Sequence, residues 1–88
     1  MDAQALVARN VRRLRVARGL SQEALAVDAE IDRTYVSRLE RETENPTVAV
    51  LERLAKALGV DIVDLFERYS PGDAAPAVLP KGRRPKQS

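Results

Sequence analysis

Short stretches with apolar residues at helical spacing, separated by turn residues, make up almost all of the first 69 positions. The first stretch places Val7, Val11 and Leu14 on one face of a helix, and the arginines between them face away. The later stretches repeat this pattern, which constrains the chain to a bundle of small helices packed face to face. The expected helices are residues 3–18, 22–29, 33–41, 48–58 and 62–69.

Residues that favour helix ends flank these stretches. Ser, Thr and Asp side chains accept hydrogen bonds from the first turn of a helix, and Gly adopts the left-handed conformation that ends many helices. The Asn45-Pro46 pair separates the third helix from the fourth. The expected caps are Asp2, Ser21, Asp32, Thr47 and Asp61 at the starts and Gly19 and Gly59 at the ends.

The core has to be built from Leu, Val and Ala, because the 88 residues include no Trp, one Phe and two Tyr. A chain of this length forms one domain and buries only about 60% of the surface of its unfolded form. We therefore predict an all-α, compact five-helix domain over residues 1–69. Its inward-facing positions in the second, third and fourth helices are Leu25, Ala26, Val36, Leu39, Leu51, Leu54, Ala55 and Leu58.

The composition excludes most catalytic and metal-binding chemistry. The chain has no His and no Cys, so it lacks the commonest general base, the commonest metal ligand and any thiolate. Its Asp and Glu residues fit helix caps and solvated surface, and no glycine-rich phosphate-binding loop is present. We expect no enzyme activity, no cofactor and no metal site. No segment resembles a membrane span or a signal peptide, which favours a cytoplasmic protein.

Charge is distributed unevenly along the chain. Residues 1–69 carry 11 Arg and Lys against 12 Asp and Glu, whereas residues 70–88 carry 4 basic residues against Asp73 alone. Four of the five prolines also lie in residues 70–88, which show no periodicity. We predict a disordered, basic, Pro-rich tail there. Such a tail suits contact with an anionic partner or simple solubilisation.

The segment "DRTYVSRLERE", residues 32–42, carries an unusual polar face. Val36 and Leu39 point inward, and the outward side carries Arg33, Thr34, Ser37, Arg38 and Arg41. A merely solvated face commonly mixes both charge signs, yet no acid occupies the outward positions between Arg33 and Arg38. Because this helix follows a short helix and a three-residue turn, the pair forms a helix-turn-helix. The pattern favours DNA reading over a solvated face.

Residues 20–60, "LSQEALAVDAEIDRTYVSRLERETENPTVAVLERLAKALGV", resemble the Cro/repressor-type helix-turn-helix of the XRE family, the lambda repressor-like regulators. The Ser-Gln opening of the second helix, the Leu-Glu-Arg ending of the third, the Asn-Pro turn and the Leu-Ala-Lys-Ala-Leu-Gly-Val run carry the resemblance. "DRTYVS" is most similar to the controller proteins of restriction–modification systems. Glu30 and Glu42 depart from the family, which usually has Gly there, so strained turns are expected.

The resemblance and the side-chain chemistry together imply roles in DNA binding, with helix 33–41 in the major groove of double-stranded DNA. Arg33 and Arg38 can each bond guanine O6 and N7, and Thr34 can contact a thymine methyl or a base edge. Tyr35 and Ser37 suit phosphates or base edges.

Three further residues are expected at phosphates. The Gln22 amide is expected to bond a phosphate and, as the corresponding glutamine does in the family, to brace Arg33. Arg41 and Asn45 follow the reading helix and either contact phosphates or are ordinary exposed turn residues.

The resemblance also implies two structural features outside the DNA-reading face. Arg15 and Glu40 occupy positions that the family pairs in a partly buried salt bridge. The last helix is richer in apolar residues than a short terminal helix needs, which favours a two-fold dimer interface. The expected interface residues are Ile62, Val63, Leu65, Phe66 and Tyr69.

These observations predict a sequence-specific transcriptional regulator, active as a homodimer on a palindromic operator and without a small-molecule effector. Regulation would follow protein concentration, for example by autorepression. The alternative is an antitoxin-like protein-interaction module that neutralises a partner through its tail and uses the helix-turn-helix for autoregulation.

Overall fold

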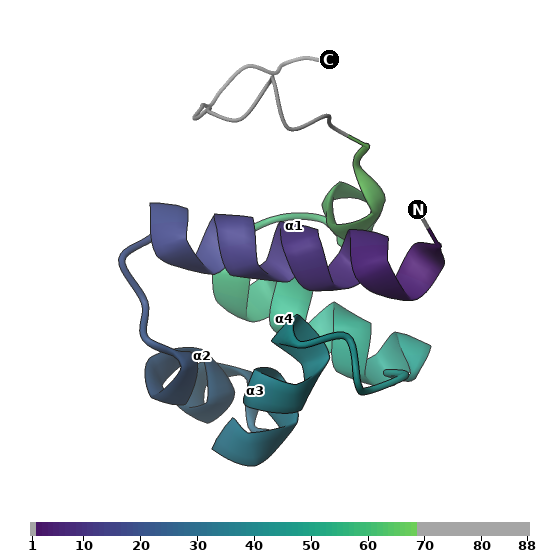
Figure 1. The fold of residues 1–88 in the computed structure, drawn as a ribbon. Helices are drawn as coiled ribbons and strands as arrows, with labels where there is room; N and C mark the ends of the chain where they lie inside the picture. Colours follow the sequence, from purple (N-terminus) through teal and green to yellow (C-terminus); the bar gives the residue numbers. More distant parts are fainter. Residues whose placement is uncertain (1, 69–88) are drawn as a thin grey trace.

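The computed structural model describes residues 2–68, and within them every regular element is helical. The four α-helices match the expected positions within one residue at either end. The elements are α1 (Ala3–Ala17), α2 (Gln22–Ala29), α3 (Arg33–Glu40), α4 (Val48–Leu58) and the 3₁₀ helix η1 (Ile62–Phe66) (Figure 1).

The fifth helix is the main difference from the sequence-based expectation. Instead of an α-helix over residues 62–69, the chain forms only the five-residue η1, and Glu67 is already extended with ψ of 133°. The backbone N–H of Asp61 donates to Asp64 Oδ2 at 2.9 Å, which fixes this single tight turn. The predicted tail, residues 70–88, lies outside the described residues.

Most of the expected caps form the expected hydrogen bonds. Asp2, Ser21 and Thr47 each accept a bond from the backbone N–H three positions later, at 2.8, 2.9 and 3.2 Å. Gly59 ends α4 in the left-handed conformation with φ of 73°. Asp32 has the extended backbone of an N-cap, but its side chain makes no capping bond. The α3 helix therefore starts without a side-chain cap, and the Asp32 carbonyl accepts from the N–H groups of Tyr35 and Val36.

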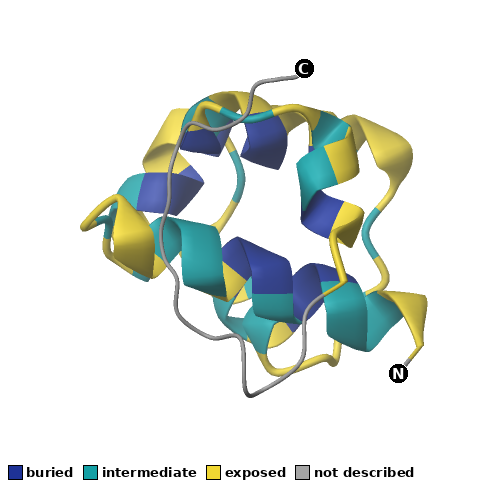
Figure 2. Cartoon of the chain, turned by 90° about the horizontal axis from the view of Figure 1, so that it is seen from above, coloured by how far each residue is buried: buried dark blue, intermediate teal, exposed yellow. Residues whose placement is uncertain are grey.

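The core lies where α1, α4 and the α2–α3 pair meet. All eight predicted inward positions of α2, α3 and α4 are buried, and so are Val7 and Val11 of α1. Figure 2 shows the buried residues of these helices facing the middle of the molecule. The α2 helix packs against both α3 and α4, while η1 packs against α1 and α4. None of the helices in residues 2–68 is long and apolar enough to cross a membrane.

One buried polar side chain, Asn10, joins α1 to the segment after α4. It is fully buried, and its Nδ2 donates to the backbone carbonyls of Leu65 at 3.0 Å and Glu67 at 2.8 Å. Its Oδ1 accepts a hydrogen bond from Arg13 Nη2 at 3.0 Å. These bonds hold η1 on the bundle although the element is too short to form a stable helix alone.

Candidate nucleic-acid interface

The α2–α3 pair is held rigidly enough to present one face of α3 to solvent. The turn between the helices passes through Glu30, whose φ of 61° is left-handed, and the N–H of Ile31 donates to the Ala26 carbonyl at 2.9 Å. Ile31 then packs on the core, as do Val36 and Leu39 of α3. Glu30 thus has the left-handed conformation that was expected to strain this turn. Glu42 after α3 adopts the same conformation with φ of 66°.

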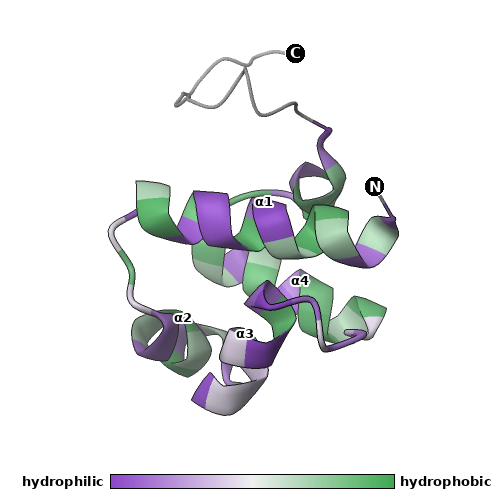
Figure 3. Cartoon of the chain, in the orientation of Figure 1, coloured by the Kyte–Doolittle hydropathy of each residue, from purple (hydrophilic) through white to green (hydrophobic). Residues whose placement is uncertain are grey.

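The outward face of α3 carries the predicted reading residues. Arg33, Thr34 and Arg38 are exposed, and Tyr35 and Ser37 are half-buried. Figure 3 shows α3 as a mainly hydrophilic helix. Within residues 2–68, the Arg33 side chain makes no hydrogen bond or ion pair. Its guanidinium is therefore available for a bidentate contact with an acceptor pair outside the domain.

Arg38 differs from Arg33 because an acid engages it. Its Nε donates to Glu44 Oε2 at 2.9 Å, and its Nη2 forms an ion pair with the same oxygen. Tyr35 lies in the field of this pair: burial raises the pKa of its phenol, Glu44 raises it further and Arg38 lowers it. Glu44 has no predicted role, because it lies six residues after Arg38, beyond the spacing of three or four at which helix neighbours meet.

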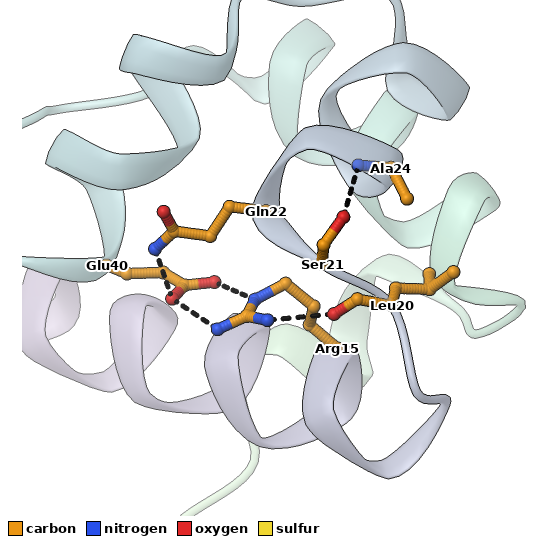
Figure 4. A network of polar contacts seen from close by, with 6 residues as sticks. All are labelled: Arg15, Leu20, Ser21, Gln22, Ala24 and Glu40. Carbon is orange, nitrogen blue, oxygen red and sulfur yellow. Dashed lines mark hydrogen bonds and ion pairs between the residues drawn. The ribbon is translucent and has the colours of Figure 1, made fainter.

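Behind α3, a polar network ties this helix to α1 and α2 (Figure 4). Arg15 of α1 donates from Nε and Nη2 to the two oxygens of Glu40, at 2.7 and 3.0 Å, and from Nη1 to the Leu20 carbonyl at 2.8 Å. The side chains of Arg15 and Glu40 are only 14% and 5% exposed. The structure thus contains the ion pair that the family resemblance implied.

Gln22 belongs to this network rather than to Arg33. Its Nε2 donates to Glu40 Oε1 at 3.1 Å, so the predicted brace on Arg33 is wrong for this structure (Figure 4). The amide remains half-exposed at the start of α2, where its oxygen and second hydrogen are free to meet a ligand.

Arg41 and Asn45 lie after the helix rather than on it. Arg41 is the C-cap of α3, and both residues are exposed in the segment that leads to α4. Neither side chain has a hydrogen-bond or ion-pair partner among the described residues.

The predicted dimer residues do not form one exposed face. Val63 and Phe66 are 69% and 40% exposed, and Ile62 is half-buried. Leu65, in contrast, is fully buried in the domain's own core, so its assignment to an interface is wrong. The single turn of η1 explains the difference, because only part of it can point outward while Leu65 anchors it. Tyr69 lies outside the described residues.

The geometry of two short packed helices, the second with a bare polar face, defines a helix-turn-helix domain. The helix-turn-helix family HTH_3 matches residues 11–65, and the chain belongs to this family.

Known relatives agree with this assignment. The chain is 43% identical over 76 residues to an uncharacterized HTH-type transcriptional regulator of Sinorhizobium fredii, covering 86% of this chain and 95% of the relative. The crystal structure of a hypothetical transcription factor, NHTF, from Neisseria is similar with a TM-score of 0.73 and 42% identity, covering 82% of this chain and 80% of that one.

A controller protein is also similar in structure. The restriction–modification controller protein C.Esp1396I, solved as a tetramer in complex with its natural 35-base-pair operator, gives a TM-score of 0.69 at 35% identity. The match covers 75% of this chain and 87% of the controller protein.

Proposed function

We propose that this protein is a sequence-specific, double-stranded DNA-binding transcriptional regulator that inserts α3 into the major groove. The observation that carries the proposal is the exposed Arg33–Thr34–Arg38 face on the second helix of a helix-turn-helix. Family membership supports it, as do relatives named as transcriptional regulators and a controller protein solved on its operator. As part of this proposal, the protein acts by binding DNA rather than as an enzyme, and it works in the cytoplasm.

The contacts divide into two groups by chemistry. Arg33 and Arg38 present planar donors that match guanine O6 and N7, and the methyl of Thr34 suits a thymine. Gln22, Tyr35 and Ser37, which are half-buried at the rim of this face, fit phosphate oxygens or base edges at its border.

Arg41 and Asn45, exposed after α3, complete the proposed phosphate contacts. The base contacts specify the operator, whereas the phosphate contacts position the protein on it.

The proposal includes a two-fold dimer on a palindromic operator. Two copies would set their α3 helices about 34 Å apart, one turn of DNA, to reach successive major grooves. The exposed apolar side chains Val63 and Phe66 support an interface at η1. The tetramer of the controller protein on its operator shows that a relative assembles on DNA.

Selection of fragments bound by the full chain from random DNA tests this function. We expect a symmetric motif, and we expect Arg33→Ala to erase preference at defined positions of each half-site, worth about 1–3 kcal/mol of discrimination. Arg41→Ala should instead weaken binding to all sequences alike, because phosphates carry no sequence. Failure to enrich any motif would contradict the proposal.

A further inference from the structure

The guanidinium of Arg38 is held by Glu44 through one edge only. Both donors that reach Glu44 Oε2, Nε and Nη2, lie on the side edge of the guanidinium. The terminal edge, formed by Nη1 and the second hydrogen of Nη2, makes no contact within residues 2–68. A guanidinium has five N–H donors, so this pairing leaves the end-on pair for an external acceptor.

Glu44 is itself fixed by the fold. Its side chain is 18% exposed, against 49% for Arg38. Its backbone carbonyl accepts a hydrogen bond from Gln4 Nε2 of α1. One position earlier, Thr43 lies against the end of α3. Its N–H and its Oγ1 both donate to the Arg38 carbonyl at 2.9 Å. The segment after α3 therefore folds back and delivers Glu44 to the arginine.

We propose that Glu44 is a specificity-determining positioning residue, which orients Arg38 so that its terminal edge meets a guanine in the major groove. This inference rests on the proposed function. Guanine O6 and N7 accept two parallel N–H bonds, which the end-on edge of an arginine can supply while its side edge stays on a carboxylate. Without Glu44, the Arg38 side chain would adopt several orientations toward bases and phosphates, and its preference for guanine would be lost.

The pair differs from ordinary surface ion pairs, which hold two mobile side chains weakly. Here the acid is largely buried and anchored through its backbone, so only the arginine has to be ordered. A different role, in which Glu44 withholds Arg38 from DNA, predicts the opposite outcome. Removing a withholding acid raises affinity for DNA, whereas removing a positioning acid reduces the ability to tell one base from another.

The experiment compares Glu44→Gln with Glu42→Gln in the full chain. Glu42 is an exposed acid two residues away, and its side chain has no partner in the described part of the chain. Both substitutions remove the same charge near the DNA, but only the first one releases Arg38. The selected operator and its single-base variants serve as probes, and Arg38→Ala first identifies the base pair that Arg38 reads. Circular dichroism verifies that each variant folds.

We expect Glu44→Gln to lower discrimination at the Arg38 base pair by about fivefold or more, while preference elsewhere stays as in Glu42→Gln. Unchanged discrimination, with a uniform gain in affinity equal to that of Glu42→Gln, would overturn the inference and leave the proposed function intact. Arg38→Ala without loss of preference at any position would overturn it as well. If the wild type selects no sequence, the proposed function fails and the inference fails with it.

Discussion

Asn10 donates its side-chain amide to the backbone carbonyl of Leu65, at 3.0 Å, and so joins the first helix to the last turn across 55 positions of the sequence. The same amide reaches the Glu67 carbonyl at 2.8 Å. These two bonds are buried or partly buried, so no bulk water replaces them readily when the donor is lost.

Asn10→Ala should lower the free energy of unfolding by about 1–3 kcal/mol, because it leaves the carbonyls of Leu65 and Glu67 without their donor. Urea unfolding followed by circular dichroism measures the change. Arg12→Ala is the matched control on the same helix, since Arg12 is exposed, and it should stay within about 0.5 kcal/mol of the wild type. Equal effects of the two substitutions would contradict the role of Asn10.

The second prediction concerns the Arg15–Glu40 ion pair behind α3. Glu40→Ala should cost about 3–5 kcal/mol, because it leaves the largely buried Arg15 guanidinium without its carboxylate. Thermal and urea unfolding both report this loss. Replacing both residues together by apolar ones of similar size should cost less than Glu40→Ala alone, since no unpaired charge remains.

Glu67→Ala provides the exposed counterpart. Glu67 pairs with Arg13 at 3.6 Å, and its side chain is 62% exposed. Its removal should cost less than about 1 kcal/mol. If Glu40→Ala were as mild as Glu67→Ala, the burial of the Arg15–Glu40 pair would not determine its contribution.

Periodicity and caps were sufficient to locate the four α-helices and their inward faces. Each of those helices has apolar residues along one face. Ser21 caps the start of α2, Thr47 caps the start of α4 and Gly59 ends α4. The same reasoning overextended the last helix. Ile62, Val63 and Phe66 fit an α-helix equally well, but the hydrogen bonds of Asn10 to η1 and its neighbour are tertiary and leave no trace in local spacing.

The sequence predicts which residues lie at the candidate site but not which of their side chains bond to one another. Arg33 and Thr34 lie on the outward face because Val36 and Leu39 have to point inward, which the sequence pattern requires. The partners of Arg38 and Gln22 depend on how the segment after α3 folds back and on where Glu40 sits. Neither can be read from helical spacing, because Glu44 approaches Arg38 through a turn anchored on α1.

The third prediction concerns the two left-handed glutamates. Glu30→Gly and Glu42→Gly should each stabilise the fold by about 0.5–1 kcal/mol, because φ of 61° and 66° costs a side chain about 1–2 kcal/mol and costs Gly little. Denaturant midpoints compare each variant with the wild type. Glu52→Gly, at an exposed position inside α4, should lose about 1 kcal/mol instead. Destabilisation at all three positions would argue against strain in the turns.

The fourth prediction concerns assembly through η1. Val63→Asp and Phe66→Asp should shift the protein from dimer to monomer at micromolar concentration without unfolding it, because both side chains are exposed in the monomer. Sedimentation velocity measures the shift. Val27→Asp, on α2 and also 69% exposed, is the control and should leave the dimer intact. Leu65→Asp should unfold the domain, since Leu65 is fully buried. A monomeric wild type would contradict the interface.

The last prediction uses Tyr35 to test whether the Arg38–Glu44 pair persists in solution. Burial and Glu44 raise the pKa of the Tyr35 phenol, and Arg38 lowers it. Glu44→Gln should therefore lower this pKa, whereas Arg38→Ala should raise it, and Glu42→Gln should leave it unchanged. Tyrosinate absorbance in a Tyr69→Phe background reports Tyr35 alone, because the chain has two tyrosines.

The raised pKa of Tyr35 also limits the pH range over which the folded protein can be titrated. A folded-state pKa above the ordinary value of 10.0 favours the neutral phenol in the folded protein. The resulting stability is fully present below that pH and is lost as the pH rises through the folded-state pKa. Circular dichroism at each pH therefore has to show that the fold persists. If Glu44→Gln and Glu42→Gln gave the same Tyr35 titration in the folded state, Glu44 would not lie beside Tyr35 and Arg38 in solution.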